Sequence, residues 1–435
     1  MNRSRVSPTI PPNVCLRQLK KQAKDLVKAH NRGEADVCSL LRNLKRFATA
    51  SDREILAAEI LLNEAQYALA LHYGFTSWNA LKAHIDALDA EIQAHPIQTD
   101  PDGGRVILGF ETLDWGGSPQ RRANSTMEVF AAILRAMGQD MPYERLMGLS
   151  GQAFRIQVAR EAFCPSAACA GPGFNTEKTA THATGCPITW WEVEHAKGRP
   201  DTDGLRRAIV ESIDRGIPAL YVNEETSLLV GYRDNGKSLI LRDYFNCNAP
   251  NSGYSKAERQ PWSVGIVHPK PAPPDYEKTV ADSLRLALRL ARTDSFDGYD
   301  SGFQAWSTWC GRLRNEFPDG REIQFSDMLG NWYPYASLID ARHAASVYLN
   351  DVARLFPGEP RPHLENAVAL FDQMQQSLYS RFDVVPAPWA VNENNPWTQA
   401  QRDAQAAVME NALDLERRAF SEIEIALKNI ETPEG

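Results

Sequence analysis

The stretch SLLVGYRDNGKSLILRDYF, residues 227–245, consists of two apolar runs separated by a tight turn. Both runs are rich in branched and aromatic side chains, which favour strands. Between them lies Asp234-Asn235-Gly236, and Asn-Gly between apolar runs is the strongest short-range signal for an antiparallel hairpin. We therefore predict an antiparallel sheet in the middle of the chain.

Further strands and two helices are predicted around this hairpin. Residues 124–138, NSTMEVFAAILRAMG, predict an amphipathic helix capped by Asn124 or Ser125, and residues 201–216 predict a second helix capped near Thr202. Strands are expected within 105–113, 217–222 and 261–269. The order of these elements predicts an α+β domain over residues 105–270, bounded by Pro- and Gly-rich linkers at 96–104 and 269–278.

Both flanks of this domain predict helices. Residues 14–94 carry helix-period apolar residues, and Ser51 with Glu54 spells a capping box ahead of a long apolar run. Residues 279–430 are again helical in pattern, and we assign their tryptophans Trp306, Trp309 and Trp332 to core packing. The predicted fold class is α+β, with a helical N-terminal module at 1–95, the central domain, and a helical C-terminal domain at 276–435.

Composition describes an ordinary globular chain of 435 residues with a net charge of −8 and seven cysteines. The odd, scattered cysteines do not indicate a disulfide framework, and residues 1–14 lack the apolar core of a signal peptide, so we expect a cytoplasmic protein. The most apolar run is interrupted by Glu59 and Glu64, which argues against a membrane span.

The N-terminal fifty residues differ in charge from the rest of the chain. They hold eleven Lys and Arg against three Asp and Glu. A basic surface of this kind can dock an acidic protein partner. No recognition-helix or base-stacking pattern accompanies the charge, so nucleic acid is not the expected partner.

Two resemblances to known families add to this reading. Residues 16–34 and 69–85, ending in HYGFTSWNALKAHI, resemble a small helical module often found ahead of ankyrin repeats in bacterial proteins. YERLMGLSGQAFR at 143–155, with GIPAL at 216–220 and the 227–245 hairpin, resembles the N-terminal domain of the butirosin biosynthesis protein H family. More loosely, this region is similar to the cysteine-peptidase-like domains of bacteriocin-processing transporters.

The second resemblance covers roughly residues 107–330 and implies a papain-like central domain. In such families a cysteine at the start of the early helix is the nucleophile, and a histidine on the first hairpin strand is its base. A carboxylate or amide on the next strand orients that histidine. The butirosin-type family transfers an acyl group from a carrier protein by cysteine chemistry.

When the family's catalytic positions are carried over residue by residue, this chain has oxygen-bearing side chains where the family has a cysteine thiol and a histidine ring. The nucleophile position falls near Ser125, the base position on Glu225 or Thr226, and the orienting acid on Asp243, while Gln120 lies near the oxyanion-hole position. We interpret Ser125 as a helix N-cap and Glu225 as a surface acid at a strand end. The alternative makes Ser125 a nucleophile and Glu225 its base, which requires burial to raise the pKa of Glu225.

The stretch FCPSAACAGPGFNTEKTATHATGC, residues 163–186, supports three hypotheses. Cys164, Cys169, His182 and Cys186 have a spacing that zinc sites use, so zinc is one. A Cys164 nucleophile with His182 as base is the second. The favoured interpretation is a loop in which the cysteines are small packing residues.

Together these observations lead to a functional hypothesis with two alternatives. We expect a degenerate, non-peptidase protein that binds a small or peptide-like ligand in its central cleft, without a cofactor unless zinc is bound. Alternatives are an acyltransferase or amide hydrolase that uses Cys164 or Ser125, and an adaptor that docks an acidic partner through residues 1–50. Arg155 could line the cleft or instead form a buried ion pair with Asp243 or Glu225. The predicted ligand contacts are Arg155, Gln120, Trp190, Tyr232 and Tyr244.

Overall fold

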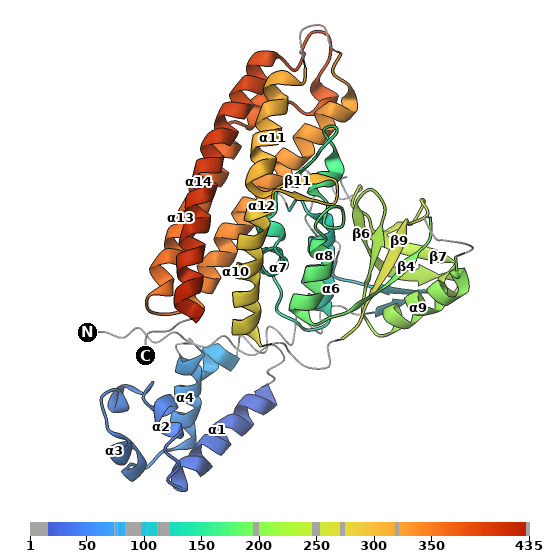
Figure 1. Ribbon diagram of the computed structural model, residues 1–435. Helices are drawn as coiled ribbons and strands as arrows, with labels where there is room; N and C mark the ends of the chain where they lie inside the picture. Colours follow the sequence, from blue (N-terminus) through green and yellow to red (C-terminus); the bar gives the residue numbers. More distant parts are fainter. Residues whose placement is uncertain are drawn as a thin grey trace. The chain divides into compact units, whose positions relative to one another are not determined.

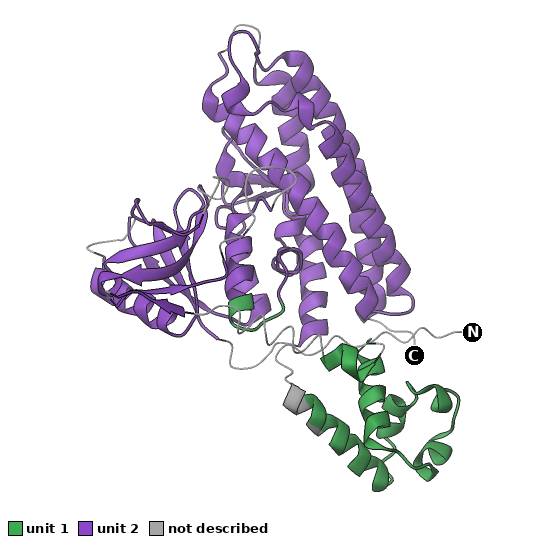
Figure 2. Cartoon of the chain, turned by 180° about the vertical axis from the view of Figure 1, so that it is seen from behind, with its two compact units in different colours: residues 1–96, 135–140 green, residues 97–134, 141–435 purple. Residues whose placement is uncertain are grey.

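A computed structural model gives the fold of the chain. It describes residues 16–73, 75, 77–82, 97–101, 103–110, 113, 122–194, 200–245, 253–269, 275–317 and 322–431. The contacts divide the chain into two compact units, one of residues 1–96 with 135–140, the other of residues 97–134 with 141–435 (Figure 2). The second unit therefore holds both the predicted central domain and the predicted C-terminal helices.

The first unit is helical. Its elements are α1 (Leu16–Asn31), α2 (Val37–Leu41), the 3-10 turn η1 (Lys45–Phe47), α3 (Asp52–Ala57) and α4 (Leu62–His72) (Figure 1). One side of each helix is apolar because leucine, alanine and isoleucine recur at helical spacing, and these side chains form a common core. On the opposite side of α1, Lys20, Lys24 and Lys28 are exposed at spacings of four residues.

The apolar run after Ser51 is not one helix, contrary to the prediction. The capping box of Ser51 and Glu54 is present, but the helix that it starts ends at Ala57, and a new helix starts at Leu62. The break places Leu61 and Leu62 on the surface, 54% and 40% exposed. Residues 78–82 are helical, and residues 83–96 lie outside the described residues.

The second unit contains an eight-stranded antiparallel sheet. Strand β6 (Thr226–Arg233) pairs with β5 (Ala219–Val222) and β7 (Ser238–Arg242), and β5 pairs in turn with β9 (Ser263–Val267). Strands β4 (Ile188–Glu192), β8 (Ser255–Lys256), β2 (Arg105–Ile107) and β1 (Ile97–Thr99) complete it. Strand β1 lies inside the predicted 96–104 linker, and Asp100 N donates to the carbonyl of Gly104 at 2.8 Å between it and β2.

The hairpin predicted from residues 227–245 is confirmed. Leu228 pairs with Arg242 and Arg233 with Ser238, which fixes the antiparallel register. Asp234, Asn235 and Gly236 all have positive φ, at 51°, 53° and 83°. These residue types tolerate the left-handed region better than others, so the turn sequence and the turn geometry agree.

Four helices accompany this sheet in the sequence. They are α6 (Ser125–Ala136), α7 (Tyr143–Ser150), α8 (Thr176–Thr184) and α9 (Thr202–Asp214). Helix α8 corrects the prediction that residues 163–186 form only a loop. Asn175 caps it through a hydrogen bond from Lys178 N at 2.7 Å, and Gly185 ends it in the left-handed conformation.

The C-terminal half forms a bundle of long helices. It consists of α10 (Tyr276–Arg292), α11 (Gly302–Asn315), α12 (Phe325–Leu355), α13 (Pro360–Ser380) and α14 (Gln399–Glu431) (Figure 1). Trp306 and Trp309 of α11 and Trp332 of α12 are buried, as predicted. A small second sheet joins β3 (Gln157–Ala159) to β11 (Tyr299–Ser301) and β10 (Ser295–Phe296). The fold is α+β with helices at both ends of the chain, as the sequence indicates.

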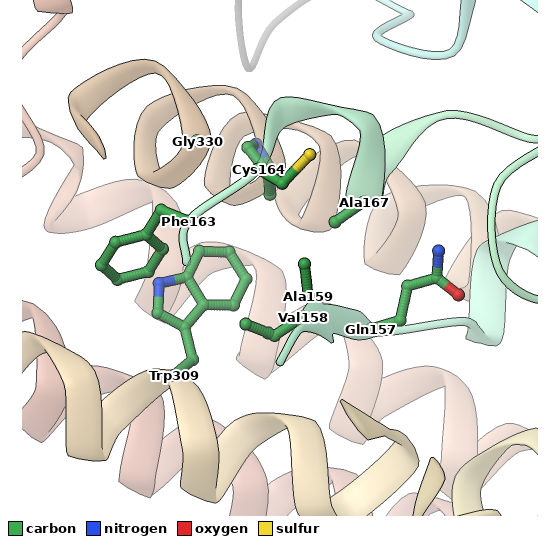
Figure 3. Close-up of a pocket in the computed structure, with 9 residues that line it drawn as sticks. Gln157, Val158, Ala159, Phe163, Cys164, Ala167, Trp309 and Gly330 are labelled. Carbon is green, nitrogen blue, oxygen red and sulfur yellow. The ribbon is translucent and has the colours of Figure 1, made fainter. Parts of the chain in front are cut away.

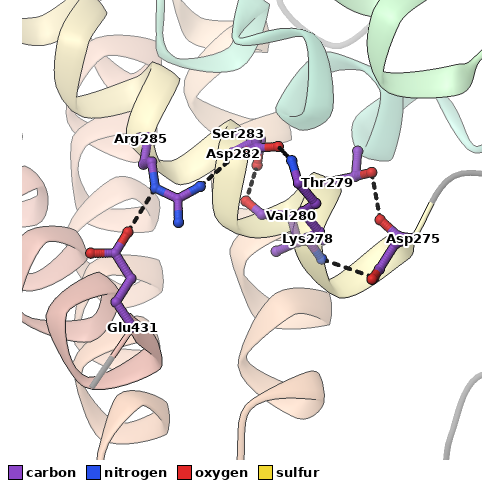
Figure 4. Close-up of polar contacts among 8 residues, drawn as sticks. All are labelled: Asp275, Lys278, Thr279, Val280, Asp282, Ser283, Arg285 and Glu431. Carbon is purple, nitrogen blue, oxygen red and sulfur yellow. Dashed lines mark hydrogen bonds and ion pairs between the residues drawn. The ribbon is translucent and has the colours of Figure 1, made fainter. Parts of the chain in front are cut away.

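The start of α10 is fixed by its cap and by a link to α14. Asp275 accepts hydrogen bonds from Lys278 N at 3.1 Å and, through its carbonyl, from Thr279 Oγ1 at 2.6 Å. Arg285, further along α10, forms ion pairs with Asp282 and Glu431 (Figure 4). These exposed contacts contribute little stability individually, but they define where the bundle begins.

One ion pair is fully buried between the long helices. Arg342 of α12 and Glu416 of α14 have no exposed side-chain surface, and their charged groups lie 2.8 Å apart. Glu416 also accepts a hydrogen bond from Trp306 Nε1 at 3.1 Å, while Arg342 donates to the carbonyl of Ala153 at 2.8 Å. The pair therefore connects three bundle helices to the segment that follows α7.

Helices α7 and α12 approach so closely at Gly148 that no side chain fits between them. A Cβ atom at this position would lie 2.1 Å from Cγ of Tyr348. Replacing Gly148 with alanine should therefore destabilise the second unit by about 1–3 kcal/mol or more, measured as a fall in its thermal unfolding midpoint.

Gly311 provides the matched control for this substitution. It lies inside α11, and a Cβ there would meet nothing within 4 Å. Alanine is the better helix former by about 0.5–1 kcal/mol, so G311A should leave stability unchanged or raise it. Equal destabilisation by both substitutions would contradict the packing argument.

Candidate functional site

The candidate site begins at the first residue of α6. Asn124 caps this helix, because its Oδ1 accepts a hydrogen bond from Met127 N at 3.0 Å. Of the two predicted caps, Asn124 is confirmed, and the interpretation of Ser125 as the N-cap is wrong. The Ser125 hydroxyl instead donates to Glu225 Oε2 at 2.6 Å and accepts a hydrogen bond from Thr226 N at 3.0 Å.

Glu225 precedes strand β6 and is not a free surface acid. The interpretation of Glu225 as a surface acid at a strand end is therefore wrong. Burial raises the pKa of its carboxyl group to about 7, while hydrogen bonds with Ser125 and Tyr333 act in the opposite direction. A carboxyl group with this pKa is both ionised and protonated in substantial fractions near neutral pH. That property suits a proton acceptor for a hydroxyl group.

Tyr333 belongs to α12, more than two hundred residues from the start of α6. Its hydroxyl interacts with the Glu225 carboxyl group and also lies 3.3 Å from the carbonyl oxygen of Ala123. Burial raises its pKa well above the ordinary value for tyrosine, so the phenol stays protonated. The single O–H of Tyr333 can thus be directed either to the carbonyl of Ala123 or, when Glu225 is charged, to its carboxylate as a hydrogen bond.

A second residue of α12, Asp340, contacts Ala123 through the amide group of that residue. Asp340 Oδ2 accepts hydrogen bonds from Ala123 N at 3.1 Å and from the Tyr143 hydroxyl at 2.5 Å. Burial raises the pKa of Asp340 to about 7, and these two hydrogen bonds lower it. Both Tyr333 and Asp340 were missed by sequence reasoning. The carboxyl group of Asp340 directly after Leu338 and Ile339 was the available signal.

Asp243 does not join Ser125 and Glu225. Thr226 and Ser227 are consecutive in β6, so their side chains point to opposite faces of the sheet. Thr226 Oγ1 lies 2.7 Å from Thr126 Oγ1 on α6, whereas Ser227 Oγ donates to Asp243 Oδ1 at 3.1 Å. Asp243 therefore lies on the sheet face away from α6. The carboxyl group of Glu225 is hydrogen-bonded by Tyr333 instead.

Arg155 organises the cysteine-containing segment and forms neither of the ion pairs considered for it. Its guanidinium donates to the backbone carbonyl oxygens of Ala167, Cys169, Pro172 and Phe174. Asn124 and Gln152 donate to the carbonyl of Ala168. The segment is thus held against the start of α6 through its backbone, since buried carbonyl groups require donors.

Cys164 and Cys169 flank a single 3-10 turn, η3 (Pro165–Ala168). Cys164 borders a cavity of only about 10 Å³ between this turn, β3 and α12, together with Trp309 and Gly330 (Figure 3). Such a space holds about one water molecule, not an acyl substrate. Burial raises the pKa of Cys169 to about 12, which keeps its thiol protonated and unreactive.

The predicted zinc ligands are not gathered into one group. His182 is exposed on α8, whereas Cys186 is fully buried. No group of three or more metal-binding side chains is found among the residues that the structure describes, and no hydrogen bond there joins Cys164 to His182. Metal analysis of the purified chain remains the direct test of zinc.

The predicted ligand contacts lie apart from one another. Trp190 packs over Gly265 and Trp191 against Gly204 of α9, so the two indoles face opposite sides of β4 as expected. Tyr232 is buried and donates its hydroxyl proton to Asp214 at 2.7 Å, and Tyr244 is also buried. Gln120 lies outside the described residues.

Comparisons with known proteins add no family to this picture. A scan against protein-family models found no match, and a search of curated proteins found none either. Within the described residues, no helix has a long enough apolar stretch to cross a membrane. Functional argument therefore rests on the geometry of the chain itself.

Proposed function

We propose that Ser125 and Glu225 form a serine-type acyl-transfer site, in which Ser125 is the nucleophile and Glu225 its general base. The observation that carries the proposal is the 2.6 Å hydrogen bond from Ser125 Oγ to Glu225 Oε2. These residues are one hundred positions apart, and they occupy the positions that the papain-like resemblance assigns to nucleophile and base. In this enzymatic alternative, the hydroxyl group of Ser125 takes the place of the cysteine thiol as the nucleophile.

The chemical steps need no group beyond these side chains and the substrate. Ser125 Oγ bonds to the carbonyl carbon of an ester, thioester or amide, and its proton passes to Glu225. The bond to the leaving group then breaks, and Glu225 returns the proton to the departing alcohol, thiol or amine. Water or a second acceptor repeats the sequence on the acyl–Ser125 ester.

The start of α6 supplies electrostatic support for this step. The first amide groups of a helix have no acceptor within it, and the helix dipole adds partial positive charge there. Ser125 is the first residue of this twelve-residue helix. An oxyanion that forms at the bonded carbonyl carbon would therefore develop beside donors rather than beside other anions.

A fluorophosphonate probe tests the proposal. It should label the full-length chain at Ser125, identified by mass spectrometry of the modified peptide, because the probe requires an activated hydroxyl. S125A should abolish labelling, whereas C164S should not change it. If labelling is absent, or persists in S125A, the serine-type site is wrong and the ligand-binding hypothesis takes its place.

The acidic-partner hypothesis concerns the first unit only. The exposed lysines of α1 support a docking surface for an acidic protein. Binding of that kind should weaken as salt is added, because exposed charges are screened.

A further inference from the structure

A second site lies on the opposite face of the sheet from Ser125. It is an open pocket with a volume of about 240 Å³. Its floor is formed by the ends of β5 and β7, and its wall by β8 and the residues that follow. The polar, charged and aromatic side chains that line it are Tyr221, Asn223, Asp243, Phe245, Ser255, Lys256, Glu258 and Arg259.

The wall of the pocket is fixed in place by backbone hydrogen bonds. Ser255 pairs with Leu241 of β7, and Ala257 N donates to the carbonyl of Leu239 at 2.9 Å. Beyond the wall, Trp262 N donates to the carbonyl of Val222 at 2.8 Å, and the Tyr221 hydroxyl donates to the carbonyl of Arg259. The pocket is therefore formed before any ligand arrives, which lowers the entropic cost of binding.

An acid lies in the floor of the pocket, and charges of both signs lie at its rim. Asp243 is half-buried in the floor, held by Ser227 Oγ at 3.1 Å and by Phe245 N at 3.3 Å. Burial of Tyr221 and, to a lesser degree, the charge of Asp243 raise the pKa of Tyr221 to about 12. The phenol of Tyr221 therefore remains a neutral donor. Lys256, Glu258 and Arg259 are exposed at the rim, and Arg259 lies 3.0 Å from Glu224.

An aromatic surface lies between these charges. The ring of Phe245 is 52% exposed, and the Arg259 guanidinium stands 5.5 Å from its centroid. An exposed ring beside two carboxylates and two cations offers contacts to a ligand that is apolar in part and charged at both ends. The volume, below the range of about 300–1,000 Å³ that is common for small-molecule pockets, limits the ligand to about the size of a dipeptide.

We propose that this pocket binds a small zwitterion, such as a dipeptide, with its ammonium group at Asp243 and its carboxylate at Lys256. The site does not depend on the proposed chemistry at Ser125, since the two lie on opposite faces of β6. It gives the expected peptide-like ligand a location that the sequence did not indicate.

Calorimetric titration of the full-length chain tests the pocket with three matched dipeptides. Glycyl-phenylalanine carries both charges, its N-acetyl derivative lacks the ammonium group, and its C-terminal amide lacks the carboxylate. The zwitterion should bind at least about tenfold more tightly than either derivative, since each removes one charge-assisted contact. S125A should bind all three as the unmodified chain does.

Two substitutions assign the charges to residues. D243N should remove the preference for the free ammonium group, and K256Q should remove the preference for the free carboxylate, each without a change in melting temperature. The proposal is overturned if glycyl-phenylalanine gives no binding at millimolar concentration. Equal binding of the three dipeptides, or unchanged preferences in both variants, would overturn it as well. Because S125A separates this readout from labelling at Ser125, either proposal can fail alone.

Discussion

Replacing Glu225 with glutamine should slow fluorophosphonate labelling of Ser125 by about 10²–10⁴-fold, the range that general-base assistance supplies. Glutamine keeps the size of the side chain and an oxygen that can accept the Ser125 hydrogen bond. It cannot take up the proton. The rate of labelling, followed by intact-protein mass spectrometry, therefore measures the base separately from the positioning of Ser125.

The pH dependence of labelling provides an independent measure of the same group. Glu225 must be ionised to accept a proton, and the pKa of its carboxyl group is raised to about 7. Labelling of the unmodified chain should thus rise through about pH 7 and level off above it, while E225Q should lack that rise. A flat profile for the unmodified chain would contradict the assignment of Glu225 as base.

Tyr333 supplies a matched control for this profile. Its hydrogen bond lowers the pKa of Glu225, so Y333F should move the midpoint of the profile to higher pH. The rate on the plateau should change less than in E225Q, because the base itself remains. An unchanged midpoint would place Tyr333 outside the site.

The largest expected effect on stability comes from the buried pair of Arg342 and Glu416. R342M leaves a carboxylate without a cationic partner in the bundle interior, which costs about 3–5 kcal/mol of unfolding free energy. Urea unfolding followed by tryptophan fluorescence reports on this region, since Trp306 donates directly to Glu416. The denaturation midpoint of R342M should fall sharply.

The double variant R342M/E416L separates the free-energy cost of the uncompensated buried charge from the cost of lost packing. Apolar replacement of both partners removes the uncompensated charge and should recover most of the lost stability. Recovery should be incomplete, because Trp306 Nε1 and the carbonyl of Ala153 lose their partners. A double variant as unstable as R342M would show that charge burial is not the cause.

Local signals in the sequence predict the sheet and most helices of this chain. The hairpin follows from Asp234-Asn235-Gly236, whose residue types match the positive φ values of the turn. The helix break at 58–61 was missed because Ile60 and Leu61 continue the apolar pattern, although Ala58 already has an extended backbone. Periodicity alone cannot detect a change of direction between apolar residues.

The candidate site was only partly predictable, for a different physical reason. The family resemblance indicated Ser125 and Glu225, whose hydrogen bond the structure provides. It could not indicate Tyr333 or Asp340, because these residues reach Ala123 across separations of 210 and 217 positions. Nothing local in the sequence of α12 distinguishes a buried tyrosine that packs from one that donates a hydrogen bond to a distant carboxylate.

Tyr333 and Asp340 of α12 both hydrogen-bond to the backbone of Ala123, and these contacts limit how the molecule can be divided. A chain shortened after residue 275 keeps every strand of the main sheet, yet it loses both the donor to Glu225 and the acceptor for Ala123 N. The surroundings of Ser125 and Glu225 are thus completed by residues of both the sheet region and the bundle. Grafting or exchanging either half between proteins would remove these contacts even where each half still folds.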